Sequence, residues 1–121
     1  MLQLIKSRRS IRKFTGQPVE DEMLEQIIEA GTWAPSGLNN QPWKVAIVRD
    51  AATRKTIAPL TRYSSIIDGA PVLLALFMDT AAGYDRTKDV QAMGAFIQNL
   101  LLAVHALGLG GVWLGEILKN K

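Results

Sequence analysis

The chain of 121 residues contains no cysteine and a single histidine, His105. Without cysteine it can form no disulfide, no Cys-ligated zinc or iron–sulfur site and no thiol nucleophile. One histidine leaves little material for a metal site or for a histidine-centred catalytic triad. We therefore expect no protein-bound metal and no catalytic side chain, and we expect a bound organic cofactor to carry any chemistry.

Long apolar runs are missing as well. The most apolar stretch surrounds Leu100–Val104, and it is too polar for a transmembrane helix because Gln98, Asn99 and His105 interrupt it. The N-terminus has neither the apolar core nor the small-residue cleavage site of a signal peptide. These absences predict a soluble, cytoplasmic protein with no membrane partner.

Hydrophobic residues make up 48% of the chain, an ordinary share for a folded protein, and the length predicts one domain over residues 1–121. The formal charge is only +3, but positive residues gather near the N-terminus. Such a cluster attracts nucleic acid, acidic lipid or a phosphorylated small molecule. Its members are Lys6, Arg8, Arg9, Arg12 and Lys13.

Hydrophobic periodicity and capping residues predict four helices, which span Met1–Arg9, Val19–Gly31, Ala51–Ala58 and Asp89–Leu107. The second helix places four apolar residues on one face, which we expect in the core: Met23, Leu24, Ile27 and Ile28. The last helix is apolar on nearly every face, so a partner surface must cover more than one of its sides.

Three strands are predicted, at Lys44–Arg49, Val72–Met78 and, more briefly, Val112–Leu114. The segments Thr32–Trp43 and Asp79–Lys88 are irregular by composition, and Gln41 is expected to be extended because it precedes Pro42. The predicted fold class is helix-rich α+β, with too few strands for a doubly wound sheet.

The motif RRSIRKF, at residues 8–14, is a candidate phosphate receptor. Arg8 and Arg12 are four residues apart and would share a helical face, with the Ser10 hydroxyl between them. On spacing alone, a solvated basic face is the commoner interpretation. Nucleic-acid binding is disfavoured because no aromatic or glycine-rich RNA-binding signature accompanies the cluster.

Two further segments are rich in small residues, APSGLNNQPW at 34–43 and GLGGVWLGE at 108–116. Both would allow a flat ligand to approach the backbone closely, although each alone is also typical of an ordinary loop. The glycine-rich segment is not a dinucleotide-binding fingerprint, because no predicted strand precedes it and no helix opens on it.

Taken together and in this order, from Ile5 to Glu116, the three segments closely resemble the nitroreductase family of flavoproteins. The resemblance implies an α+β fold with a mixed, largely antiparallel sheet flanked by helices. It also implies a homodimer with FMN at the interface, whose core is built by the helix predicted at Asp89–Leu107.

The resemblance assigns FMN-binding roles to three groups of residues. The basic motif would hold the ribityl chain, the phosphate and the polar ring edge, the central loop would pack on the ring from the other subunit, and the glycine-rich segment would line the ring. By similarity these residues are Arg8, Arg9, Ser10 and Arg12; Pro35, Ser36, Gly37 and Asn39; and Trp113, Leu114 and Gly115. Asn99 and His105 are interpreted as structural.

The implied activity is that of an FMN-dependent oxidoreductase. Hydride would pass from NADH or NADPH through FMN to a small acceptor such as a nitroaromatic, a quinone or a flavin, in a ping-pong cycle. The segments Thr61–Asp68 and Asp79–Asp89 would select the acceptor. The alternative is a flavin-binding or redox-sensing module with little turnover.

Members of the family usually continue well past the position of Glu116, with a further helix, a strand and a C-terminal extension. The resemblance therefore implies that the C-terminal portion of the family is missing here. Lys119 cannot be assigned the role of the basic residue that this extension often contributes to the phosphate site.

Overall fold

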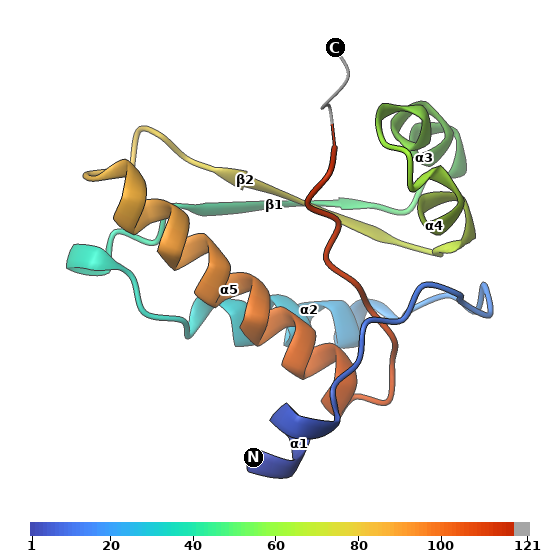
Figure 1. Ribbon diagram of the computed structural model, residues 1–121, viewed down its shortest axis with the longest axis horizontal. Helices are drawn as coiled ribbons and strands as arrows, with labels where there is room; N and C mark the ends of the chain where they lie inside the picture. The colour runs from blue at the N-terminus through green and yellow to red at the C-terminus, as the bar shows by residue number, and fades with distance from the viewer. Residues whose placement is uncertain (118–121) are drawn as a thin grey trace.

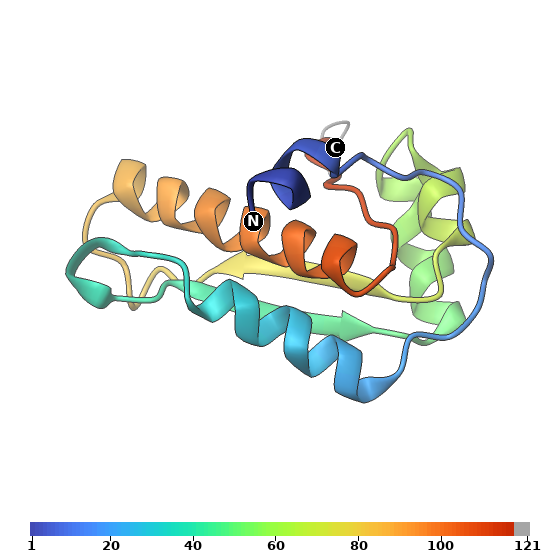
Figure 2. The same ribbon diagram turned by 90° about the horizontal axis from the view of Figure 1, so that it is seen from below.

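The structure, a computed structural model, describes residues 1–117. Two antiparallel strands form a sheet, and two long helices pack side by side on one face of it (Figure 1). Two short helices lie beyond one end of the strands (Figures 1 and 2). The helices are α1 (Leu2–Ser7), α2 (Asp21–Thr32), α3 (Ala51–Ile57), α4 (Ser64–Gly69) and α5 (Arg86–Ala106), with short 3₁₀ turns η1 (Gly37–Asn39) and η2 (Ala58–Leu60).

The sheet pairs β1 (Trp43–Val48) with β2 (Leu73–Met78) over their full lengths, with Trp43 opposite Met78. Both strands were predicted within one residue at each end. Alternation along β1 turns Trp43 and Val45 toward the helices, where they meet Leu74 and Leu76 from β2. The predicted α+β class is confirmed.

The core lies between α2, α5 and the sheet. Its buried centre consists of Ile27, Ala34, Phe96 and Leu100. Phe96 is fully buried and stacks on Trp43, with ring centroids 4.9 Å apart. Gly31 permits this arrangement, because a Cβ there would lie 2.7 Å from the Phe96 ring. Of the apolar residues predicted for α2, Leu24 and Ile27 are buried, whereas Met23 and Ile28 are half-buried.

The start of α2, the helix α4 and the third strand differ from the predictions. Helix α2 begins after Val19, whose carbonyl oxygen accepts a hydrogen bond from Arg49 at 2.7 Å. Helix α4 is not among the helices that the sequence predicts. The third strand predicted at Val112–Leu114 is wrong, since the described chain after Gly111 has no regular structure. This stretch instead crosses to the turn before α4, where the Thr61 hydroxyl donates to the backbone and carboxylate oxygens of Glu116.

Helix α5 leaves apolar side chains on several faces, as predicted. Ala92, Phe96 and Leu100 are buried, while Met93, Ile97 and others are only half-covered by the rest of the described chain. None of the helices within residues 1–117 is long and apolar enough to cross a membrane.

Candidate functional site

The basic motif is extended rather than helical. Helix α1 ends at Ser7, and Arg8 already has φ −59° and ψ 136°. The prediction that Arg8 and Arg12 share a helical face is therefore wrong. The cause is a parallel bridge between Ser10 and Gly111, in which the Ile11 N–H donates to the Gly111 carbonyl oxygen at 3.0 Å.

This bridge joins two of the three predicted site segments, which are about 100 residues apart in the sequence. The contact is close because Gly110 has no side chain: a Cβ there would lie 2.9 Å from Ile11. The basic motif and the glycine-rich segment consequently lie side by side near the end of α5 (Figure 2).

Two cavities flank the bridge. The first, here called the Arg12 cavity, has a volume of about 220 Å³. Its lining includes Arg12 from the basic motif and Trp113, Leu114 and Gly115 from the glycine-rich segment. Tyr63, in the turn before α4, also lines it and was not assigned from the sequence. Four of the predicted site residues thus line one cavity.

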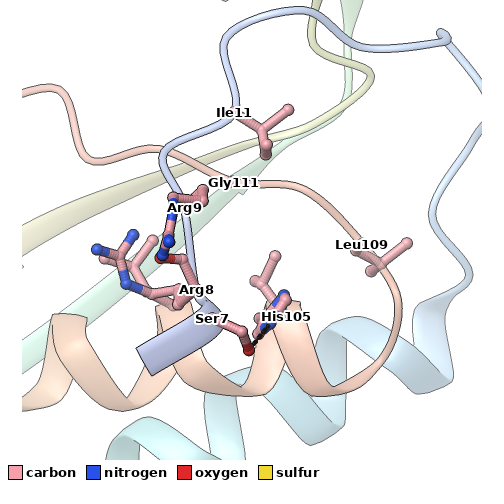
Figure 3. A pocket seen from close by; sticks show the side chains of 9 residues that line it. Ser7, Arg8, Arg9, Ile11, His105, Leu109 and Gly111 are labelled. Atoms are coloured by element: carbon pink, nitrogen blue, oxygen red, sulfur yellow. Dashed lines mark hydrogen bonds between the residues drawn. The ribbon is translucent and has the colours of Figure 1, made fainter. Parts of the chain in front are cut away.

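The second cavity, here called the Arg8 cavity, has a volume of about 210 Å³ (Figure 3). Arg8, Arg9 and Gly111 line it together with Ser7 and His105. A hydrogen bond of 2.9 Å joins Ser7 Oγ and His105 Nε2, and it fastens α1 to α5. Arg9 turns back and donates to the carbonyl oxygens of Lys6 and Arg8 at 2.8 and 2.9 Å, so it also closes the end of α1.

Arg8 and Arg12 have positive charges that no carboxylate of the described residues neutralises. The ion pairs within residues 1–117 join Lys44 to Asp79, at 3.3 Å, and Arg49 to Asp21. Because Arg12 is exposed and Arg8 half-buried, both guanidinium groups can reach an anion that enters the cavities.

The third predicted segment lies elsewhere. Pro35, Ser36, Gly37 and Asn39 occupy the end of the molecule where α5 begins, whereas the Arg8 and Arg12 cavities lie beside the end of α5 and the segment after it (Figures 1 and 2). A single chain therefore does not bring all the predicted site residues together.

This loop has an unusual backbone. Leu38, Asn39 and Gln41 have φ values of 56°, 54° and 49°, in the left-handed region that side-chain-bearing residues rarely occupy. Gln41 is therefore not extended as predicted. Its N–H donates to Ser36 Oγ at 3.1 Å and its side chain donates to Asn39 Oδ1, so the loop closes on itself. Pro42, next along the chain, is fully buried.

Sequence reasoning missed the residues that connect this loop to the body of the protein. Asn40 Nδ2 donates to the Ala82 carbonyl oxygen at 3.0 Å and to Asp89 Oδ1 at 2.8 Å. The Tyr84 N–H donates to Asp89 Oδ2 at 3.1 Å. Asp89 is buried on α5 in line with Ala92, Phe96 and Leu100. A carboxylate at helical spacing with a core stripe was the signal available in the sequence.

Comparison with known proteins places these segments in one family. The model of the nitroreductase family matches residues 5–62 and 58–121. The chain belongs to this family. A curated relative from Methanothermobacter thermautotrophicus is 35% identical over 115 residues, which cover 95% of this chain and 60% of the relative.

Solved structures show the same fold. A crystal structure of a protein from Desulfovibrio desulfuricans in complex with FMN is 52% identical, with a TM-score of 0.92, and the match covers 95% of this chain and 67% of that one. The structure of NADPH:FMN oxidoreductase from Vibrio harveyi complexed with NAD⁺ is 30% identical, with a TM-score of 0.85, and the match covers 94% and 55% of the two chains. This chain thus spans between about half and two-thirds of the length of these relatives.

Proposed function

We propose that this chain binds FMN between the basic motif and the glycine-rich segment and works as an NAD(P)H-dependent flavin oxidoreductase. The observation that carries the proposal is the Arg12 cavity, where a guanidinium group from one end of the chain meets Trp113, Leu114 and Gly115 from the other. The complex of the 52% identical relative with FMN supports the choice of cofactor.

The residues present fit the chemistry of FMN. Arg8, Ser10 and Arg12 offer guanidinium and hydroxyl donors suited to a phosphate and to ribityl oxygens. Trp113 is 55% exposed and, with Leu114, offers an apolar surface to a flat ring. A Cβ added at Gly115 would have no neighbour within 4 Å among the described residues, so the backbone there is open to a ligand.

One chain supplies only part of such a site. Pockets that enclose a cofactor-sized ligand measure roughly 300–1,000 Å³, whereas the Arg12 cavity measures about 220 Å³. We infer that a second copy of the chain completes the pocket with its loop Pro35–Asn39, in a homodimer that works in the cytoplasm. The uncovered apolar faces of α5 support this assembly.

Bound FMN would supply the redox chemistry, namely hydride acceptance from NADH or NADPH and, in a separate half-reaction, electron transfer to a small acceptor such as a nitroaromatic, a quinone or a flavin. The chain's own residues bind and orient the cofactor. Arg12 would place a positive charge beside the ring, which strengthens binding and tunes the redox potential. Trp113 and Leu114 would exclude water from one side of the ring.

The purified protein, supplied with FMN, tests this function by its absorption spectrum under anaerobic conditions. The proposal predicts that the flavin band of the complex bleaches on addition of NADH or NADPH and returns on addition of a quinone. A bound flavin that neither donor bleaches would favour a flavin-binding or redox-sensing module. Failure to acquire a flavin spectrum at all would overturn the proposal.

A further inference from the structure

Asp89 is a buried carboxylate without a cationic partner among the described residues. It is only 4% exposed, and the ion pairs within residues 1–117 involve other carboxylates. A buried carboxylate is costly unless hydrogen-bond donors surround it. The donors here are the Asn40 side-chain amide and the Tyr84 backbone N–H, so this carboxylate links the 38–41 loop, the 79–85 segment and α5.

The loop that Asp89 reaches needs such an anchor. Three of its four residues have positive φ, namely Leu38, Asn39 and Gln41. Such a backbone is unfavourable and persists only where surrounding contacts hold it in place. Leu38 is 83% exposed, so it adds little to holding the loop. Asn40 reaches across to the 79–89 region and uses its side-chain amide to donate to both Ala82 and Asp89.

The Asn40 side chain meets its partners through its donor group alone. Both bonds come from Nδ2, while Oδ1 is buried with no hydrogen-bond partner among the described residues. Two glycines allow the close approach. A Cβ at Gly83 would lie 2.7 Å from Asp89 Oδ2, and one at Gly37 would collide with the Tyr84 ring.

We propose that Asp89 is a positioning residue, which fixes the loop Pro35–Asn39 in the conformation that meets FMN on a second copy of the chain. Its consequence for FMN rests on the proposed function, whereas its effect on the loop does not. The 79–89 segment, predicted to help select the acceptor, ends on the same carboxylate, so Asp89 also couples that segment to the flavin loop.

Amide hydrogen exchange and FMN affinity test the proposal in the full chain. Asp89→Asn is close in shape but replaces one of the two acceptor oxygens with an NH2 group, so the donor of either Asn40 or Tyr84 loses its acceptor. We expect the amides of Asn39, Asn40 and Gln41 to exchange about tenfold faster, and the Kd for FMN to rise by about the same factor. The matched control is Asp85→Asn, which removes a charge from the same end of α5, where Asp85 caps the helix by accepting from the Lys88 N–H and asparagine can do the same.

Exchange at the Phe96 and Leu100 amides serves as the internal reference for global unfolding. If Asp89→Asn unfolds the whole chain, a second pair of variants decides. Asn40→Asp sets two carboxylates against each other and should release the loop. Asn40→Asp combined with Asp89→Asn restores a bond between positions 40 and 89 but not the bond to Ala82, so it should recover part of the protection that Asn40→Asp loses. The test of the loop therefore does not depend on one variant.

The positioning role would be overturned if the loop amides of Asp89→Asn exchanged at the wild-type rate. It would also be overturned if the double variant protected these amides no better than Asn40→Asp alone. Faster loop exchange with an unchanged Kd for FMN would show that Asp89 holds the loop but does not act on the flavin. If the wild-type protein binds no FMN, the proposed function fails, and the exchange data still decide whether Asp89 positions the loop.

Discussion

At the scale of single residues, Arg12 tests whether the Arg12 cavity is a cofactor site. Arg12 is exposed, has no carboxylate partner among the described residues, and lines the same cavity as Trp113. Lys13, its neighbour, has the same charge but does not line that cavity. The pair separates a specific contact with FMN from a general effect of positive charge.

Arg12→Ala is expected to weaken FMN binding by about 10- to 100-fold, because a hydrogen bond to a charged group contributes ~1.5–3 kcal/mol. Lys13→Ala should change the affinity little. Quenching of flavin fluorescence during titration measures both. Equal affinities for the wild type and Arg12→Ala would count against a role at the phosphate or the ring edge.

In the core, the lack of a side chain at Gly31 leaves room for the Phe96 ring. Gly31→Ala would press a methyl group against the Phe96 ring and should lower the free energy of unfolding by about 1–3 kcal/mol. The control Gly69→Ala has no neighbour within 4 Å among the described residues and should be near neutral. Urea unfolding of the two variants gives the comparison, and equal stabilities would mean that α2 and α5 tolerate a wider separation.

At the scale of elements, capping residues and hydrogen bonds fix where helices begin. Asp50 precedes α3, and its carboxylate accepts hydrogen bonds from the Thr53 hydroxyl and the Thr53 N–H. These bonds lower the pKa of Asp50, the side-chain bond most strongly. The pKa of Asp79 is lowered by the Ala81 N–H and by Lys44 in the same way.

The lowered pKa of Asp50 gives stability a defined pH dependence. The ionised carboxylate favours the folded state, so its contribution is complete above the ordinary aspartate pKa of about 4 and is lost as pH falls through the lower folded-state value. The difference in unfolding free energy between the wild type and Asp50→Asn should therefore be constant above about pH 5 and shrink below pH 4. A difference that persists unchanged to pH 2 would contradict this origin.

Elements with strong periodicity could be predicted, and those that depend on distant contacts could not. Helix α5 and both paired strands follow from apolar spacing alone. The extended course of Arg8–Arg12 could not be foreseen, because it is imposed by Gly111, far away in the sequence. The same holds for the segment after Gly111, whose end meets Thr61, also far away in the sequence, through the bonds of Glu116.

The candidate site was predicted from motifs and only partly located by them. The motif resemblance named Arg12 and Trp113–Gly115, which the structure brings to one cavity. It did not reveal Asn40 or Asp89. In the sequence, Asp89 is indistinguishable from the exposed acidic residues that are common in the first turn of a helix. Their importance emerges from contacts between the loop and α5.

At the scale of the whole molecule, the proposed flavin site has two parts that lie far apart in one chain. The loop Pro35–Asn39 lies near the start of α5, whereas the basic motif and the glycine-rich segment lie near its end (Figure 1). The account therefore requires each site to combine the basic motif of one chain with the loop of another. Gly37→Ala should weaken FMN binding, because the added Cβ displaces Tyr84 and with it the loop.

Mixed dimers test the sharing of sites. A dimer of one Arg12→Ala chain and one Gly37→Ala chain contains one site with both changes and one site with neither. We expect mixtures refolded or exchanged together to regain tight FMN binding, at up to one site per mixed dimer. If each chain builds its own site, both sites are damaged and no tight binding returns, which would contradict the shared site.

The structure of the protein with bound FMN tests the central claim most directly. We expect the flavin between Arg8–Arg12 and Trp113–Gly115 of one chain, with Pro35–Asn39 of a second copy packed against its ring. A flavin bound elsewhere, or one enclosed without the basic motif, would contradict the account.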